Sequence, residues 1–102
     1  MSIFDITNID DVIHGRLRLG VMAYLASAQI ADFTELRDKL QTTDGNLSVH
    51  LRKLEDAGYI AIEKKFVDRK PLTKVTLTKT GRKAFVTYLD AMAKLVNGGG
   101  AS

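Results

Sequence analysis

The sequence predicts a mainly α-helical domain that carries a small β-hairpin, an α+β class. Three observations support this prediction. Apolar residues recur at helical spacing over about residues 11–28, and again in two shorter stretches, 33–40 and 44–57, that a tight turn separates. The spacing then alternates through residues 59–77, as in strands, before a last helical stretch at 79–96. The expected order is helix, possible short strand, helix, helix, strand, strand, helix.

Length and composition indicate one domain. The chain has 102 residues and 45% apolar residues, enough for a single hydrophobic core. We expect residues 1–96 to form that domain and residues 97–102, Asn-Gly-Gly-Gly-Ala-Ser, to form a flexible tail. The absence of cysteine excludes disulfides and thiolate metal sites. No apolar run is long enough to cross a bilayer, and the first five residues carry an acid but no base, so we expect a cytoplasmic protein with no membrane partner.

The first helix is expected from about Asp11 to Ala28. Its apolar residues Val12, Leu19 and Met22 lie away from its main apolar stripe, so the helix must be buried on more than one side. In a domain this small, such a helix suggests a subunit interface. The dipeptide that follows, Ile30-Ala31, can form a very short strand.

Capping residues define the next two helices. Asp32 can accept from the backbone N–H of Glu35 while the Glu35 side chain reaches back, which is the capping-box arrangement. The short helix should end near Leu40, and Gln41-Thr42 makes the break. Thr43 can then cap a helix that runs to about residue 57, where Gly58 provides a left-handed stop.

Two strands and a last helix complete the domain. Residues 59–66 and 72–77 alternate as strands of a hairpin, joined by an exposed basic connector at 67–71. Thr78 can cap the last helix, which should run from Lys79 to about residue 96.

The third helix presents two different faces. Its three leucines at positions 47, 51 and 54 fall together and should face the core. The opposite face suits the edges of bases in a major groove, because Asn can pair with adenine, Arg with guanine, and Val can touch a thymine methyl. The candidate DNA-binding residues of this helix and its cap are Thr43, Asn46, Ser48, Val49, His50, Arg52 and Lys53. An ordinary amphipathic helix with a mixed polar surface remains the alternative.

Basic residues concentrate after that helix. Residues 64–83 hold eight bases against one acid, a net charge of +7, whereas residues 1–12 have a net charge of −3. Such a cluster is a candidate phosphate-binding surface, and a solvated face is the alternative. We expect Arg69 and Lys70 to reach the DNA backbone or the adjacent minor groove. The strand residues Lys64, Lys65 and Lys74 would add phosphate contacts.

The last helix carries a long apolar stripe that extends beyond what the small domain needs. Packing of this stripe and of the first helix against a second subunit would bury it, which predicts a homodimer. Packing of the whole stripe inside one chain is the alternative. The expected interface residues are Val12, Leu19, Met22, Phe85, Tyr88, Leu89, Met92, Leu95 and Val96.

Several stretches resemble a known family. Residues 32–36 (Asp-Phe-Thr-Glu-Leu), 47–60 (Leu-Ser-Val-His-Leu-Arg-Lys-Leu-Glu-Asp-Ala-Gly-Tyr-Ile) and 75–85 (Val-Thr-Leu-Thr-Lys-Thr-Gly-Arg-Lys-Ala-Phe) look like winged helix-turn-helix regulators related to MarR and ArsR. The segment 14–19 (His-Gly-Arg-Leu-Arg-Leu) resembles the first helix of a compact branch of these proteins. The resemblance implies a homodimer, an approximately palindromic operator, and base reading by the exposed face of the third helix. The chain lacks the cysteines of thiolate metal sensors and is shorter than typical drug-responsive members.

We therefore expect a winged-helix DNA-binding and dimerisation domain that regulates transcription by binding specific double-stranded DNA. No nucleophile–base pair, phosphate loop or metal-ligand spacing stands out, so we expect no enzyme activity, no cofactor and no metal site. A small-molecule effector is possible but unidentified. The rival hypothesis is a winged-helix module for protein–protein contact whose basic hairpin is merely solvated.

Overall fold

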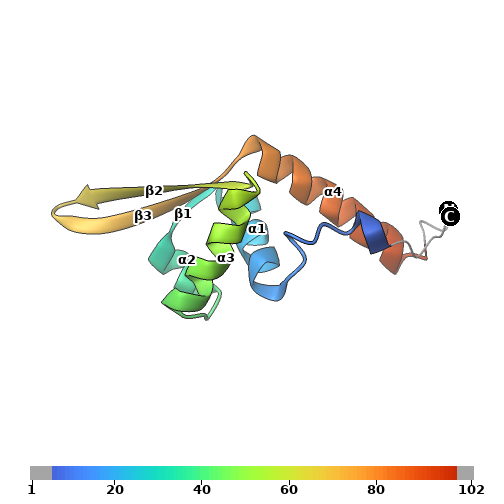
Figure 1. Cartoon of the computed structure of the whole chain (residues 1–102), viewed down its shortest axis with the longest axis horizontal. Helices are drawn as coiled ribbons and strands as arrows, with labels where there is room; N and C mark the ends of the chain where they lie inside the picture. Colours follow the sequence, from blue (N-terminus) through green and yellow to red (C-terminus); the bar gives the residue numbers. More distant parts are fainter. Residues whose placement is uncertain (1–5, 99–102) are drawn as a thin grey trace.

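The computed structural model describes residues 6–98. That part of the chain forms four α-helices and a three-stranded antiparallel sheet, which confirms the predicted α+β class and element order (Figure 1). After a short 3-10 helix, η1 (Ile6–Asn8), the elements are α1 (Arg16–Ala28), β1 (Ile30–Asp32), α2 (Phe33–Lys39), α3 (Asp44–Asp56), β2 (Ile60–Val67), β3 (Lys70–Leu77) and α4 (Lys79–Val96).

The sheet has the strand order β1-β3-β2. β2 and β3 pair along their whole length, from Ile60 opposite Leu77 to Val67 opposite Lys70. β1 pairs with three residues of β3 near its base, which confirms the expected very short strand. The outer half of the hairpin therefore projects beyond the third strand, and Figure 1 shows it extending to the left of the helices.

The hairpin turn is tighter than the sequence predicted. The expected connector at 67–71 was wrong, because the strands continue to Val67 and from Lys70 and leave Asp68 and Arg69 as the turn. Both residues have left-handed φ angles, 51° and 66°, as the two central residues of a type I′ turn require. Pro71 lies inside β3, where β1 does not reach, so its missing N–H leaves no gap in a second ladder.

The first helix begins later than expected. Instead of starting near Asp11, α1 starts at Arg16, after Gly15 in an extended conformation. The Asp10 carboxylate accepts from the backbone N–H of Val12 at 2.8 Å and from that of Ile13 at 3.3 Å, which stabilises a separate turn. Ile13 is nevertheless fully buried. The preceding segment thus joins the core without being helical.

The predicted caps hold three of the helices. Asp32 accepts from Glu35 N at 2.7 Å, Thr43 from Asn46 N at 3.2 Å and Thr78 from Gly81 N at 2.9 Å. The reciprocal half of the first capping box was wrong: the Glu35 carboxylate accepts a hydrogen bond from the Tyr24 hydroxyl of α1 instead. This side chain therefore ties α2 to α1 rather than closing its own helix start.

The segment before α1 links both ends of the core. The Asp10 carboxylate accepts from the Tyr59 hydroxyl at 2.5 Å, and this hydrogen bond, together with burial, raises the pKa of Tyr59 to about 12. The His14 ring nitrogen Nδ1 lies 3.0 Å from the Tyr88 hydroxyl of α4. One short segment thus fastens α4 to the end of α3.

Each α-helix and each β-strand contributes buried side chains to the core. The buried apolar side chains are Ile13, Val21, Met22, Leu25, Ala31, Leu36, Leu47, Leu51, Leu54, Ile60, Val75, Leu77, Phe85 and Tyr88. The molecule measures 56 × 25 × 21 Å, because the hairpin and the end of α4 project in opposite directions from that core (Figure 1). Asn97 and Gly98 still hydrogen-bond to the last turn of α4, and the rest of the expected tail, residues 99–102, lies outside the described residues. Within the described part, no helix is long and apolar enough to span a bilayer.

Close backbone contact sets the position of α4. A Cβ atom placed on Gly81 would lie 2.0 Å from the carbonyl oxygen of Tyr59, in the bend between α3 and β2. Only glycine allows the first turn of α4 to approach the chain so closely. Gly45, in the first turn of α3, has open space at the same point.

These two glycines make a matched pair for a stability test. Gly81→Ala should destabilise the fold by about 3 kcal/mol, because the new methyl group forces backbone atoms apart. Gly45→Ala should stabilise it by about 0.5 kcal/mol through helix propensity. Urea unfolding measures both values. Equal stability of the two variants would show that α4 does not depend on this contact.

Candidate nucleic-acid interface

The exposed face of α3 lies opposite the core, as predicted. Leu47, Leu51 and Leu54 are 0–2% exposed, whereas the residues between them are exposed, apart from the half-buried His50. Val49 is 56% exposed, although burial would stabilise an apolar side chain. The predicted residues on this outward side are Asn46, Ser48, Val49, Arg52 and Lys53, all exposed.

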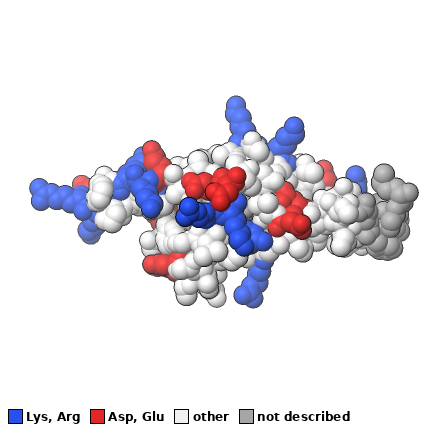
Figure 2. Space-filling model, viewed as in Figure 1, with Lys and Arg blue, Asp and Glu red and all other residues white. Residues whose placement is uncertain are grey.

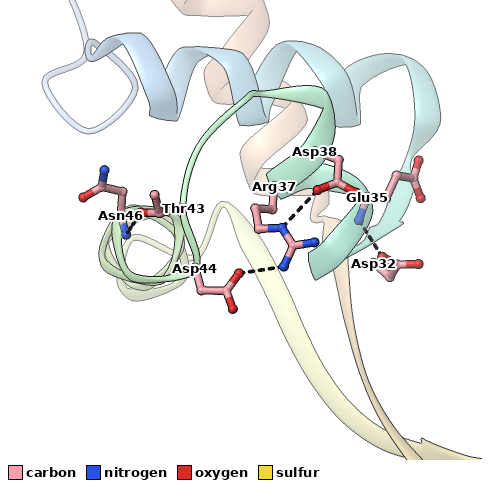
Figure 3. A network of polar contacts seen from close by, with 7 residues as sticks. All are labelled: Asp32, Glu35, Arg37, Asp38, Thr43, Asp44 and Asn46. Atoms are coloured by element: carbon pink, nitrogen blue, oxygen red, sulfur yellow. Dashed lines mark hydrogen bonds and ion pairs between the residues drawn. The ribbon is translucent and has the colours of Figure 1, made fainter.

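Polar contacts fix the start of α3 against α2 (Figure 3). The Arg37 guanidinium of α2 donates to Asp38 and, across the turn, to Asp44 in the first turn of α3, each at 3.0 Å. Thr43 caps α3 through its side-chain oxygen, and its hydroxyl hydrogen remains a donor for an outside acceptor. Sequence reasoning missed Arg37, since nothing in its local pattern shows that Asp44 is its partner.

Gln41 makes the turn between these helices possible. Its φ angle is 52°, a left-handed conformation within the predicted break at Gln41-Thr42. The backbone N–H of Thr42 then donates to Arg37 O at 3.1 Å, which closes the end of α2. The turn is short and internally bonded, so α3 is held at a defined angle.

His50 is less free than the sequence suggested. Its Nδ1 atom lies 2.8 Å from Nη1 of Arg18 in α1. Arginine is always a donor, so His50 Nδ1 must be the acceptor and its proton resides on Nε2. Burial first, and then the positive charges of Arg18 and Lys53, lower the pKa of His50. At neutral pH the residue therefore offers one neutral N–H donor on the flank of α3.

Arg18 also reaches the segment before α1. Its Nε donates to Val12 O at 2.6 Å, so one guanidinium joins that segment to α3. A shallow hollow beside this contact is lined by Arg16, Lys39, Asn46 and His50, among others. Sequence reasoning missed Arg16, Arg18 and Lys39, because they come from other helices and only tertiary packing brings them to α3.

The hairpin divides the predicted basic residues between its two faces. Side chains alternate along a strand, so Lys64 lies on the face that includes the buried Ile60. Lys64 and Thr73 line one hollow together with Ser48 and Arg52 of α3. This face of the hairpin therefore continues the exposed surface of α3.

The remaining predicted lysines are on the other face or at the tip. Lys65 forms an ion pair with Glu63 at 3.3 Å, and it shares its face with Lys74, which is half-buried. Arg69 and Lys70 are exposed at the tip. Figure 2 shows basic side chains gathered at the left end, where the hairpin tip lies in Figure 1. Lys65 is the one hairpin cation with an ion pair among the described residues, so the others remain available to phosphates.

The residues predicted to form the dimer interface differ in how much of each side chain is exposed. Met22, Phe85 and Tyr88 are at most 7% exposed inside the chain's own core, and they have little surface to offer a partner. The residues Val12, Leu19 and Met92 pack partly against that core, and Leu95 is half-buried. Leu89 and Val96 are 48% and 76% exposed. Val86, which the sequence reading did not single out, is 54% exposed and extends the same side of α4.

No group of three or more His, Asp or Glu side chains within residues 6–98 is arranged to hold a metal ion.

The helix-turn-helix, the three-stranded sheet and the projecting hairpin define a winged-helix protein. The chain belongs to the winged helix DNA-binding domain family, whose model matches residues 17–96.

Known proteins are similar to this chain in sequence or in structure. An uncharacterised protein, MJ0432 of Methanocaldococcus jannaschii, is 34% identical over 79 residues, which are 78% of this chain and 86% of that protein. A transcriptional regulator homologue from Pyrococcus horikoshii OT3 has a TM-score of 0.81 and 30% identity, covering 88% of this chain and 89% of its own. AbfR, solved bound to DNA, shares the fold with a TM-score of 0.65 and 21% identity, over 74% of this chain and 54% of its own.

Regulators described as MarR-like and as ArsR family are also among the similar structures. The resemblance seen in the sequence is therefore confirmed. The family model and the solved structures agree that this chain has the fold of a winged helix DNA-binding domain.

The Arg18–His50 contact predicts a pH dependence of stability. The pKa of His50 in the folded protein lies below its ordinary value. Neutral His50 therefore stabilises the folded state above about pH 6.5, and this contribution is lost as the pH falls through the pKa of the folded state. The free energy of unfolding of the wild type should therefore fall relative to that of His50→Gln between pH 7.5 and pH 5.

A second variant tests the cause. In Arg18→Gln, the His50 pKa should rise towards its ordinary value, measured by NMR titration of the ring. An unchanged His50 titration in Arg18→Gln would contradict the contact.

Proposed function

We propose that this protein is a sequence-specific transcriptional regulator that binds double-stranded DNA as a homodimer, with α3 in the major groove and the hairpin on the backbone and adjacent minor groove. The observation that carries this proposal is the continuous surface formed by the outward face of α3 and the Lys64 face of the hairpin. Membership of the winged helix DNA-binding domain family and a similar fold in AbfR, which was solved bound to DNA, support it. A cytoplasmic location is part of this proposal.

The side chains on α3 have distinct proposed roles. Asn46 can pair with adenine, Arg52 with guanine, and Val49 can touch a thymine methyl. Ser48 and the Thr43 hydroxyl can donate to phosphate at the start of the helix. His50 Nε2–H is a further donor, and Lys53 a further cation, on the flanks of the same face.

Cations on both sides of α3 would hold the backbone. Lys64 and the tip residues Arg69 and Lys70 lie on the hairpin side, whereas Arg16 and Lys39 border the hollow on the other side. Phosphate contacts position the protein without reading sequence, and each releases counterions. Lys65 and Lys74 lie on the opposite hairpin face, so we expect smaller contributions from them.

The dimer would form along α4. Val86, Leu89, Ala93 and Val96 recur at helical spacing on one exposed side, and the end of α4 projects away from the hairpin (Figure 1). Two copies related by a twofold axis would bury this stripe and present two α3 helices to an approximately palindromic operator.

Binding to DNA selected from a random library tests the base-reading role. Arg52→Ala should weaken binding to the selected duplex by about 1–3 kcal/mol, with little change on unrelated duplex DNA. Fluorescence anisotropy at two salt concentrations measures both affinities, and the affinity should fall steeply with salt. Lys94→Ala, at the far end of α4, removes the same charge as a control.

An equal loss of affinity for both duplexes would show that Arg52 contacts phosphate and does not read a base. Absence of binding at low salt, or binding that is insensitive to salt, would favour a module for protein–protein contact instead.

The dimer is tested by placing charge on the α4 stripe. Leu89→Glu combined with Val96→Glu should give a particle of 11.2 kDa by light scattering, whereas the wild type should have twice that mass. Both side chains are substantially exposed, so the fold should survive. Thr87→Glu adds one negative charge on another side of α4 and should leave the dimer intact. A dimer that survives the double substitution would refute this interface.

A further inference from the structure

The hairpin tip carries an apolar side chain that the functions proposed above do not use. Phe66 is 78% exposed, the most exposed large apolar side chain among the described residues. It lies opposite Pro71 in the β2–β3 ladder, one pair before the turn. An exposed phenylalanine at the end of a projecting hairpin has no role in the core, so it points to a binding partner.

Phe66 lies on the face of the hairpin that continues the α3 surface. Alternation along β2 puts it on the same face as Ile60, Ile62 and Lys64. The first two pack in or against the core, and Lys64 shares a hollow with residues of α3. Val67 is 49% exposed but lies on the other face. A ligand in contact with α3 and Lys64 would therefore meet Phe66 further along the hairpin.

The tip is rigid and surrounded by positive charge. Strand pairing continues up to Val67 and Lys70, and the two-residue turn has the positive φ angles that match the twist of a hairpin. Little backbone entropy is therefore lost when the tip binds. Lys64 is on the same face as the ring, Arg69 lies in the turn, and Lys70, opposite Val67, is on the other face. None of the three has an ion pair within residues 6–98.

We propose that Phe66, supported by Pro71, is an apolar wedge that enters the minor groove of duplex DNA, partly unstacks a base step and bends the duplex. This inference rests on the proposed function. Apolar wedges of this kind kink DNA towards the major groove, and the bend brings more of the backbone onto the protein. The bordering cations then neutralise phosphates on both sides of the groove.

The composition of the tip favours DNA over a protein partner. Its apolar surface consists of Phe66, Val67 and Pro71, with the first two on opposite faces. Stable protein interfaces bury about 800 Å² on each partner around an apolar centre. A single ring between cations is too small for such a centre, whereas it matches a groove between two rows of phosphates.

The experiment compares Phe66→Ala with Val67→Ala, which truncates the neighbouring side chain on the other face. Binding to a duplex selected from a random library is measured by fluorescence anisotropy, and bending by energy transfer between dyes at the duplex ends. Phe66→Ala should lower affinity about tenfold and reduce the bend by about 20° or more. Val67→Ala should change neither, and Phe66→Leu should keep most of both.

Base unstacking is read directly by 2-aminopurine placed at successive positions in the flanks of the selected site. Its fluorescence should rise at one position with the wild type and not with Phe66→Ala. Thermal unfolding of all three variants should match the wild type, because the two side chains are exposed.

The outcomes separate this inference from the function on which it rests. If the wild type does not bind duplex DNA, the proposed function itself fails. If the wild type binds but Phe66→Ala binds and bends DNA equally well, the wedge is refuted and the regulator remains. A lower mass of Phe66→Ala in light scattering would also refute it, because the ring would then contact a second copy.

Discussion

The burial of three leucines sets the orientation of α3 in the molecule. Leu47, Leu51 and Leu54 insert into a core formed by α1, the sheet and α4, and their burial fixes the rotation of α3 about its axis. Each such leucine contributes about 2–5 kcal/mol. Any other rotation would expose leucine and bury Asn46 or Arg52. The same constraint that stabilises the fold therefore presents a polar and basic helix face to solvent.

Polar contacts then limit the remaining freedom of α3. Arg37 holds its first turn from α2, and Arg18 holds its flank from α1. The segment before α1 joins these contacts to α4, because Asp10 reaches Tyr59 and His14 reaches Tyr88. A shift of α4 would strain the hydrogen bonds of that segment. α3 and α4 are thus coupled through a few named side chains and not only through the apolar core.

The elongated shape separates two kinds of surface. The hairpin and the outward face of α3 gather cations and one exposed aromatic ring, whereas the projecting end of α4 gathers exposed aliphatic residues. Cations without ion pairs suit a polyanion, and an aliphatic stripe suits another copy of the same helix. A small domain can carry both because they lie at opposite ends of the molecule.

Local sequence patterns were enough to predict the order of the helices and strands and the buried face of α3. Capping residues at Asp32, Thr43 and Thr78 and the leucine spacing of α3 act within a few residues, so local reasoning found them. Tertiary structure decided the rest. Burial inside one chain removed Met22 and Tyr88 from the surface, left-handed turn residues lengthened the hairpin, and partners distant in sequence gave Arg18 and Arg37 their contacts. Those outcomes depend on which segments meet in space, and a pattern of nearest neighbours along the chain does not contain that information.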